Sequence, residues 1–274
     1  MKKHLSTVIF ILAFLTGLSL LLYPTVSDYW NSFHQSRAIA SYDSEVAALD
    51  NTDYETLWTA AQDYNRRLAR QENPLVQSEE DLAEYEDLLN LDGTGAMGYI
   101  EIPELKVSLP IYHSVDDGVL QVAVGHMPGT SLPVGGKGTH SALSGHRGLP
   151  SARLFTDLDQ LREGDTFLLQ ILDETLTYEV DQVLIVEPNE VGVLAIDPEE
   201  DYCTLVTCTP YGVNTHRLLV RGHRIENQAN AASIRVTADA MQIEPVIVAP
   251  IVAAPLLLCL MLWVLLRDPK KKKR

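Results

Sequence analysis

The apolar positions of this chain gather in two uninterrupted runs, one near each end. The first extends from Leu5 to Tyr23 and the second from Val246 to Leu266, and neither contains a charged residue. Each has about the 20 residues that an α-helix needs to cross the hydrocarbon core of a bilayer. The pattern predicts a transmembrane segment within residues 1–27 and a second, C-terminal transmembrane helix over residues 246–266.

The first run allows two interpretations. Lys2 and Lys3 precede it, as basic residues precede the apolar part of a cleaved signal peptide. However, the stretch from Tyr23 to Asp28 has no pattern of small residues at which a signal peptidase would cut. An uncleaved signal-anchor is therefore predicted, with a cleaved signal peptide as the alternative.

Charge indicates how the chain is oriented in the membrane. Basic residues precede the first run and follow the second, in the tail over residues 267–274, and such residues stay on the cytoplasmic side. Both termini are thus predicted to be cytoplasmic, with residues 24–245 outside the cell membrane. Eight of the 21 Lys and Arg residues flank the runs, which leaves 13 basic residues against 36 of the 37 acidic ones, a net charge of −23. So acidic a region excludes a nucleic-acid partner.

Residues 28–92 have the periodicity of helices. Apolar side chains recur every three or four residues from Ile39 to Leu49 and again from Tyr54 to Leu68. Thr52, followed three residues later by Glu55, has the spacing of a capping box and predicts a new helix there. A third short helix is predicted over about Ser78 to Leu89. Together they form an extracellular helical arm without assigned chemistry.

The pattern changes to short, β-branched segments in residues 93–226. The predicted strands are Met97–Ile102, Val119–Val124, Thr139–Leu143, Thr166–Leu172, Leu176–Val186, Tyr202–Thr207 and Arg217–Arg221. Such spacing is typical of a closed or nearly closed β-barrel, here with one helical insertion near Ala152 to Leu161. Residues 227–245 are a linker to the second apolar run.

Cys208 is the strongest candidate for a nucleophile. It ends the apolar strand that begins at Thr204, with Pro210 two residues later, so its thiol is expected to face a loop and solvent. Cys203 lies at an odd spacing from Cys208 and is therefore expected on the opposite, buried face of the strand. Cys259 lies within the second apolar run and is assigned no chemistry.

A nucleophilic thiol needs a proton carrier and a group that stabilises the oxyanion. Of the eight histidines, His146 is the best candidate, because glycines on both sides of it within Ser144–Gly148 let backbone or substrate approach closely. Arg217 and Arg221 fall on one face of the last strand, and either would stabilise a thiolate and the developing negative charge. Their spacing alone leaves this choice open.

Several separated motifs resemble one family. Thr204–Cys208 is similar to the TLxTC signature of sortases, the membrane-bound cysteine transpeptidases of Gram-positive bacteria. Further similar segments occur in the same order at Gly125-His126, Ser131–Gly136, Thr139–Gly148, Leu154–Leu158 and Asn214–Gly222. With an apolar run at each end, the chain most resembles the class C sortases that assemble pili. The resemblance implies an eight-stranded, mostly β barrel with a transmembrane helix at each end. It also implies Cys208 as nucleophile, His146 as general acid and base, and Arg217 for oxyanion stabilisation.

The resemblance also implies a reaction. Such an enzyme cleaves an LPxTG-like sorting signal between Thr and Gly through a thioester, and joins pilin subunits through a lysine isopeptide bond. The expected partners are pilins with that signal and an acceptor lysine, together with the membrane; no cofactor or metal is expected. A housekeeping sortase that anchors surface proteins to the cell-wall precursor is the alternative. An inactive binding module and a hydrolytic thiol protease are weaker ones.

One segment departs from the class C pattern. Pilus sortases often carry a lid whose Asp-Pro-aromatic motif plugs the active site, whereas this chain has Asn73-Pro74-Leu75. Neither the acid nor the aromatic ring is present. Either Leu75 partly fills the pocket as a degenerate lid, or the site is open; the second interpretation is preferred.

Overall fold

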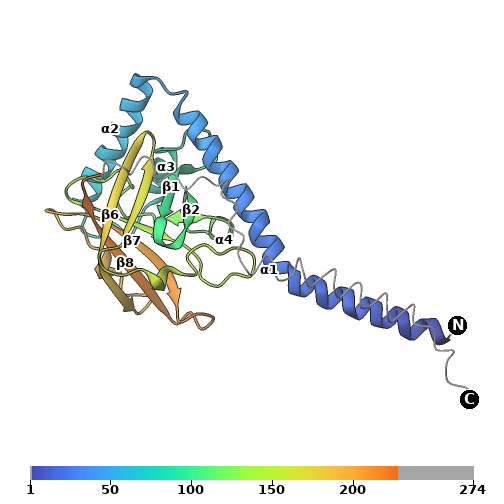
Figure 1. The fold of residues 1–274 in the computed structure, drawn as a ribbon. Coiled ribbons are helices and arrows are strands. Elements are labelled where there is room, and N and C mark those ends of the chain that lie inside the picture. Colours follow the sequence, from blue (N-terminus) through green and yellow to red (C-terminus); the bar gives the residue numbers. More distant parts are fainter. Residues whose placement is uncertain (1, 228–274) are drawn as a thin grey trace, which may run out of the picture.

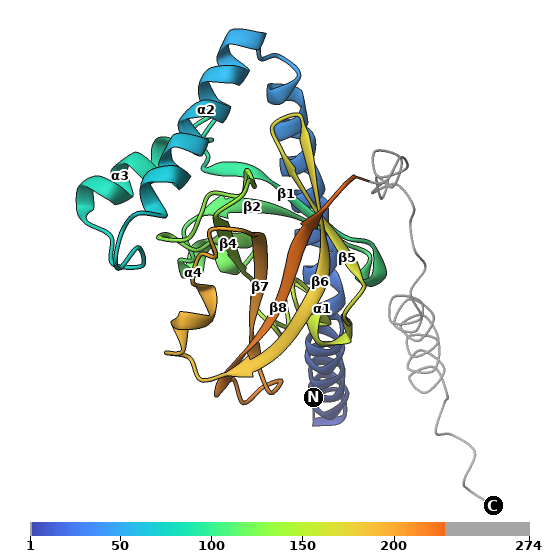
Figure 2. The ribbon, with the colours of Figure 1, turned by 90° about the vertical axis from the view of Figure 1, so that its left-hand side faces the viewer.

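Three helices precede the barrel in the computed structural model, which describes residues 2–227. The predicted C-terminal helix over residues 246–266, the tail over 267–274 and all but the first residue of the linker lie outside this range. Helix α1 (Lys2–Val46) is a single helix that continues through Pro24, and its amino-terminal half extends away from the barrel (Figure 1). Helices α2 (Asn51–Leu68) and α3 (Glu79–Asp87) follow at one side of the barrel (Figure 2).

The helix caps confirm one predicted start and correct another. Ser78 and Asp81 form a capping box before α3, close to the predicted start. The cap of α2 is Asp50 instead of Thr52, because the Asp50 carboxylate accepts the backbone N–H groups of Thr52 and Asp53, both at 2.8 Å. The break between the first two helices is therefore confirmed, two residues earlier than the Thr52 pattern indicates.

The eight-stranded barrel is confirmed, with strand order β1-β2-β3-β4-β7-β8-β6-β5. The strands are β1 (Ala96–Ile102), β2 (Val107–His113), β3 (Val124–His126), β4 (Thr139–Ser144), β5 (Thr166–Ile171), β6 (Glu174–Val186), β7 (Asp201–Thr209) and β8 (His216–Ile225). Most neighbours are antiparallel, but β2 pairs with β3 and β4 pairs with β7 in parallel. The sequence pattern misses β2, which contains Pro110, and β3, which has only three residues.

Two predicted elements are wrong. Val119–Val124 is not a strand: α4 (Asp117–Leu120) occupies its start, since the N–H groups of Val119 and Leu120 donate to the Asp116 carbonyl. Ala152–Leu161 is not an α-helix but a run of turns with the short 3-10 helix η2 (Leu158–Gln160). Leu154 has a left-handed φ of 40°, which interrupts any regular helix.

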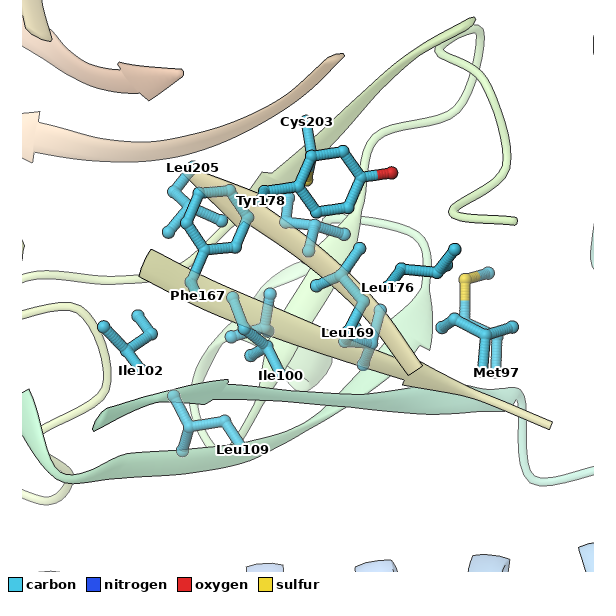
Figure 3. Packing of buried hydrophobic residues seen from close by; sticks show 14 of the residues in the cluster. Met97, Ile100, Ile102, Leu109, Phe167, Leu169, Leu176, Tyr178, Cys203 and Leu205 are labelled. Carbon is cyan, nitrogen blue, oxygen red and sulfur yellow. The ribbon is translucent and has the colours of Figure 1, made fainter. Parts of the chain in front are cut away.

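The core fills the barrel with inward side chains from nearly every strand. Ile100, Phe167, Tyr178 and Leu205 are fully buried there, and the Tyr178 and Phe167 rings stack with centroids 5.5 Å apart (Figure 3). Apolar side chains of α2 and α3 pack against the same cluster. The helical arm and the barrel thus share one core, which holds the arm in place.

A buried histidine joins α3 to the barrel. His126 Nδ1 lies 3.0 Å from the Tyr85 hydroxyl of α3, and Nε2 lies 2.8 Å from the Ser131 carbonyl. A neutral imidazole protonated on Nε2 satisfies both contacts, because it accepts from the phenol and donates to the carbonyl. Burial lowers the pKa of His126 to about 4.

We expect acid to weaken the fold through His126. The pKa of His126 in the folded protein lies below its value near 6.5 in the unfolded chain. The stability that neutral His126 contributes is therefore fully present above pH 6.5 and is lost as the pH falls toward 4, by up to about 3 kcal/mol. Urea unfolding between pH 7 and 4.5 measures the loss. His126→Gln should flatten this pH dependence, while His34→Gln, on the exposed surface of α1, should retain it. An undiminished slope in His126→Gln would refute this assignment.

Candidate active site

Cys208 and Arg217 lie opposite each other on neighbouring strands. In the antiparallel ladder of β7 and β8, Cys208 pairs with Arg217 and Val206 pairs with Leu219. Side chains at directly opposed positions have Cβ atoms about 5 Å apart and lie on the same face of the sheet. The thiol is half-buried, whereas the alternating residues Cys203 and Leu205 point into the core. The expectation for both cysteines is therefore confirmed.

The register of the sheet brings His146 to the same place. Strand β4 runs parallel to β7 with Ser144 paired to Val206, so two further residues on each chain bring His146 level with Cys208. Two hydrogen bonds hold the chain beyond β4 in this register: Gly145 N–H donates to the Val206 carbonyl at 3.0 Å, and the Thr207 hydroxyl donates to the Gly145 carbonyl at 2.6 Å. The register thus places the three candidate residues at the same end of the barrel.

Gly145 is required by close packing next to His146. A Cβ atom at this position would lie 2.6 Å from the Phe155 ring, which is fully buried. The N–H of Phe155 in turn donates to the His146 carbonyl at 3.1 Å. The irregular segment that stands in place of the predicted helical insertion therefore positions the backbone of His146.

Arg147 links the segment that contains His146 to β7, the strand of the candidate nucleophile Cys208. Its side chain is only 9% exposed, and its guanidinium donates to the Thr156 carbonyl and to the Thr209 hydroxyl, both at 3.2 Å. It also pairs with Asp159 at 2.5 Å. Since Thr209 follows Cys208 and Arg147 follows His146, this one guanidinium links the two reactive positions. The sequence interpretation missed Arg147; its place between His146 and Gly148 was the available signal.

We expect Arg147→Gln to lower kcat about tenfold, because His146 loses its fixed position relative to Cys208. Loss of the charge-assisted hydrogen bonds should also lower the free energy of unfolding by about 2 kcal/mol. Steady-state kinetics and urea unfolding measure the two effects. Arg162→Gln, at an exposed position nearby in the chain, is the matched control and should change neither. A wild-type kcat in folded Arg147→Gln would exclude the positioning role.

A groove of 120 Å³ leads along the barrel surface to Arg217. Ser144, Val206 and Leu219 on strands β4, β7 and β8 line one side, and the segment from Val186 through η3 (Val191–Leu194) lines the other. Met127 contributes from the loop after β3. The lining is mostly apolar, and Arg217 is the cation in it. The sequence patterns gave no indication of the segment at residues 187–194.

Arg221 and the remaining candidates have other partners. The Arg221 guanidinium donates to both Asp181 oxygens at 3.0 and 2.8 Å and lies over the Tyr202 ring. Buried His140 bonds the Ala195 carbonyl and the Thr204 hydroxyl, and burial lowers its pKa. Burial also raises the pKa of the Cys203 thiol well above its usual value. The geometry thus favours Arg217 over Arg221 at the site.

Comparisons with known proteins define the class. A sortase domain model matches residues 100–225. Sortase C1 of Streptococcus agalactiae, a solved structure, is 49% identical and has a TM-score of 0.69, over 70% of this chain and all of that chain. Sortase C of Streptococcus pneumoniae is 42% identical with a TM-score of 0.63, over 70% and 98% of the two chains. A sortase A of Bacillus anthracis is 27% identical over 83% of this chain and 98% of that protein.

The barrel and these similarities define a cysteine transpeptidase. The chain belongs to the sortase family, and the solved structures that it resembles include class C members.

Proposed function

We propose that this protein joins pilin subunits by covalent transpeptidation, with Cys208, His146 and Arg217 as its catalytic residues. The proposal is supported by the strand register, which places these residues at one end of the barrel, and by the mostly apolar groove that Arg217 lines. The similarity to S. pneumoniae sortase C supports a pilin substrate, because the structure of that protein is described as giving insight into pilin substrate specificity.

In the first half-reaction, the Cys208 thiolate attacks the carbonyl carbon between Thr and Gly of an LPxTG-like signal. The Arg217 guanidinium stabilises the oxyanion by charge and hydrogen bonding. The C–N bond then breaks, His146 gives its proton to the departing glycine amine, and a thioester to Cys208 remains.

In the second half-reaction, a lysine amine of another pilin attacks the thioester. His146 takes a proton from that amine, the C–S bond breaks, and Cys208 is released as the thiolate. An isopeptide bond joins the two subunits, and the enzyme returns to its starting protonation.

Incubation of the full chain with a pilin carrying an LPxTG-like tail tests the proposal. A ladder of covalent pilin multimers, resistant to denaturant, is expected. A housekeeping reaction would instead transfer the pilin to a small amine acceptor such as a lipid-linked glycine, without a ladder. That outcome, or hydrolysis alone, would overturn pilus assembly as the function.

We further propose that α1 anchors the protein, with the barrel outside the membrane and both termini in the cytoplasm. One helix in the described range is long and apolar enough to span a bilayer. The basic residues beyond the two apolar runs support the orientation.

We also propose that the site is open. The backbone of Pro74 and Leu75 lies against Gly129, where a Cβ atom would come within 2.4 Å of the Pro74 carbonyl oxygen. Among the described residues that line the groove, none belongs to residues 70–80. The contact with Gly129 supports an anchored connection between α2 and α3 that leaves the thiol uncovered.

Alkylation of Cys208 distinguishes an open site from a degenerate lid. We expect iodoacetamide to react at the same rate with the wild-type chain and with a variant in which residues 73–77 are replaced by a Gly-Ser segment of equal length. Mass spectrometry locates the adduct. Faster alkylation of the variant would mean that Leu75 shields the thiol, and the open site would then be wrong.

A further inference from the structure

Helix α1 presents one polar face to the barrel just beyond the apolar run. The Asp28 carboxylate accepts the N–H of Arg153 at 2.9 Å, and Asn31 donates its amide to the Ser151 carbonyl at 2.8 Å. One turn later, buried Gln35 donates to the Val122 carbonyl at 2.7 Å. The spacing of three and four residues defines a continuous helix face that is bonded to barrel loops.

The opposite face of the same segment carries large apolar side chains that are largely exposed. Val26, Tyr29, Trp30 and Phe33 are between 56% and 64% exposed. Along this face, one turn beyond Phe33, the next exposed residue is the charged Arg37. We name Val26, Tyr29, Trp30 and Phe33 the aromatic face of α1.

Water is an unfavourable environment for such a surface. Four large apolar side chains on consecutive turns form a patch that marks an interaction site on a soluble protein. Tyr and Trp are also the residues enriched where a membrane helix crosses the lipid headgroups. The aromatic face continues directly from the apolar run that ends at Tyr23, and it ends where Arg37 begins the polar surface.

We propose that the aromatic face lies in the headgroup region of the bilayer, so that the bilayer surface is a docking surface for the catalytic end of the barrel. This inference rests on the proposed anchoring by α1 and goes beyond it. The residues from Val26 to Phe33 span about 10 Å of helix, longer than the roughly 6 Å of one headgroup layer, so α1 leaves the membrane obliquely with this face toward the lipid. The barrel then lies on the side of α1 that faces away from the lipid, about one helix diameter from the membrane surface.

The barrel loops bonded to α1 belong to the catalytic end. Ser151 and Arg153, which contact Asn31 and Asp28, lie a few residues after His146 in the same segment. A Cβ atom at Gly148 would lie 2.7 Å from the ring of Tyr211, which places the β7–β8 loop against this segment as well. Tyr211 and Val213 of that loop are 60% and 65% exposed. A second apolar surface thus lies beside the site and is available to the same lipid.

Fluorescence quenching in vesicles tests the docking. The chain contains three tryptophans, at positions 30, 58 and 263. The full-length W58F/W263F variant, in phosphatidylcholine vesicles brominated near the headgroup end of the acyl chains, should lose about half of its Trp30 emission, as expected for an interfacial residue. The matched W30F/W263F variant reports Trp58, which stacks on Tyr54 in α2, and should remain unquenched.

Two further reporters separate the possible failures. Leu15→Trp, in a chain without the natural tryptophans, should be quenched by lipid brominated deep in the acyl chain. If it is not, and the protein does not float with vesicles, the proposed anchor itself fails. If Leu15→Trp is quenched but Trp30 behaves like Trp58, the anchor stands and the aromatic face is in water, which overturns the docking.

Tyr211→Trp, in a chain without the natural tryptophans, tests the placement of the catalytic end. It should be quenched by lipid brominated near the headgroup end of the acyl chains. If it is not quenched, the catalytic end does not lie beside the lipid.

Discussion

Replacing Cys208 with Ala should abolish pilin joining, with a loss of roughly 10⁴-fold or more in kcat. The reason is that both half-reactions pass through the bond to this sulfur, and alanine offers no atom to form a thioester. No covalent adduct with an LPxTG-like peptide should be detectable by mass spectrometry. The rate of ladder formation, compared with the wild-type chain, measures the effect.

Cys203→Ala is the matched control, because it removes the other cysteine of β7. Its sulfur lies in the core, and burial holds the pKa of the thiol well above its usual value, so it stays protonated and inert (Figure 3). The variant should lose about 1 kcal/mol of stability from the small cavity and keep its kcat. Ladder formation that survives in Cys208→Ala would rule out thioester chemistry at this site.

The cysteines also illustrate what the sequence can predict. The side chains of a strand alternate between its two faces, so an odd separation was enough to place Cys203 inside the barrel and Cys208 outside it. Other local patterns located most of the strands, as short β-branched segments, and the start of α3. Such predictions succeed because each depends only on the neighbours of a residue along the chain.

Predictions that needed the tertiary structure failed or stayed open. The segment from Ala152 to Leu161 has apolar spacing that resembles a helix, but its buried side chains belong to the core of the barrel and its backbone is a run of turns. The contacts of Arg147 could not be predicted from its place beside His146, since its partners Thr209 and Asp159 lie 62 and 12 residues away in the chain. Spacing alone likewise left the choice between Arg217 and Arg221 open, because both lie on the same face of β8, and only the resemblance to sortases indicated Arg217.

The hydrogen-bond partners of Arg217 and Arg221 distinguish their roles more clearly than their spacing in the sequence does. Arg221 is saturated by Asp181 and by the face of Tyr202, with its guanidinium carbon 4.2 Å from the ring centroid. Arg217, by contrast, is hydrogen-bonded only to the backbone carbonyls of Asn214 and His216 in the described part of the chain. Its remaining N–H groups therefore have capacity for a substrate oxyanion at the adjoining thiol.

We expect the two alanine substitutions to separate activity from stability. Arg217→Ala should lower kcat by about 10²- to 10³-fold, the usual cost of losing an oxyanion donor, and leave the urea midpoint close to wild type. Arg221→Ala should retain kcat but lower the free energy of unfolding by about 1 to 3 kcal/mol, because it leaves the half-buried Asp181 carboxylate without its partner. Kinetics and urea unfolding on both variants decide the matter. The reverse pattern, with activity lost in a folded Arg221→Ala and kept in Arg217→Ala, would move the oxyanion role to Arg221 and require the guanidinium to leave Asp181 during the reaction.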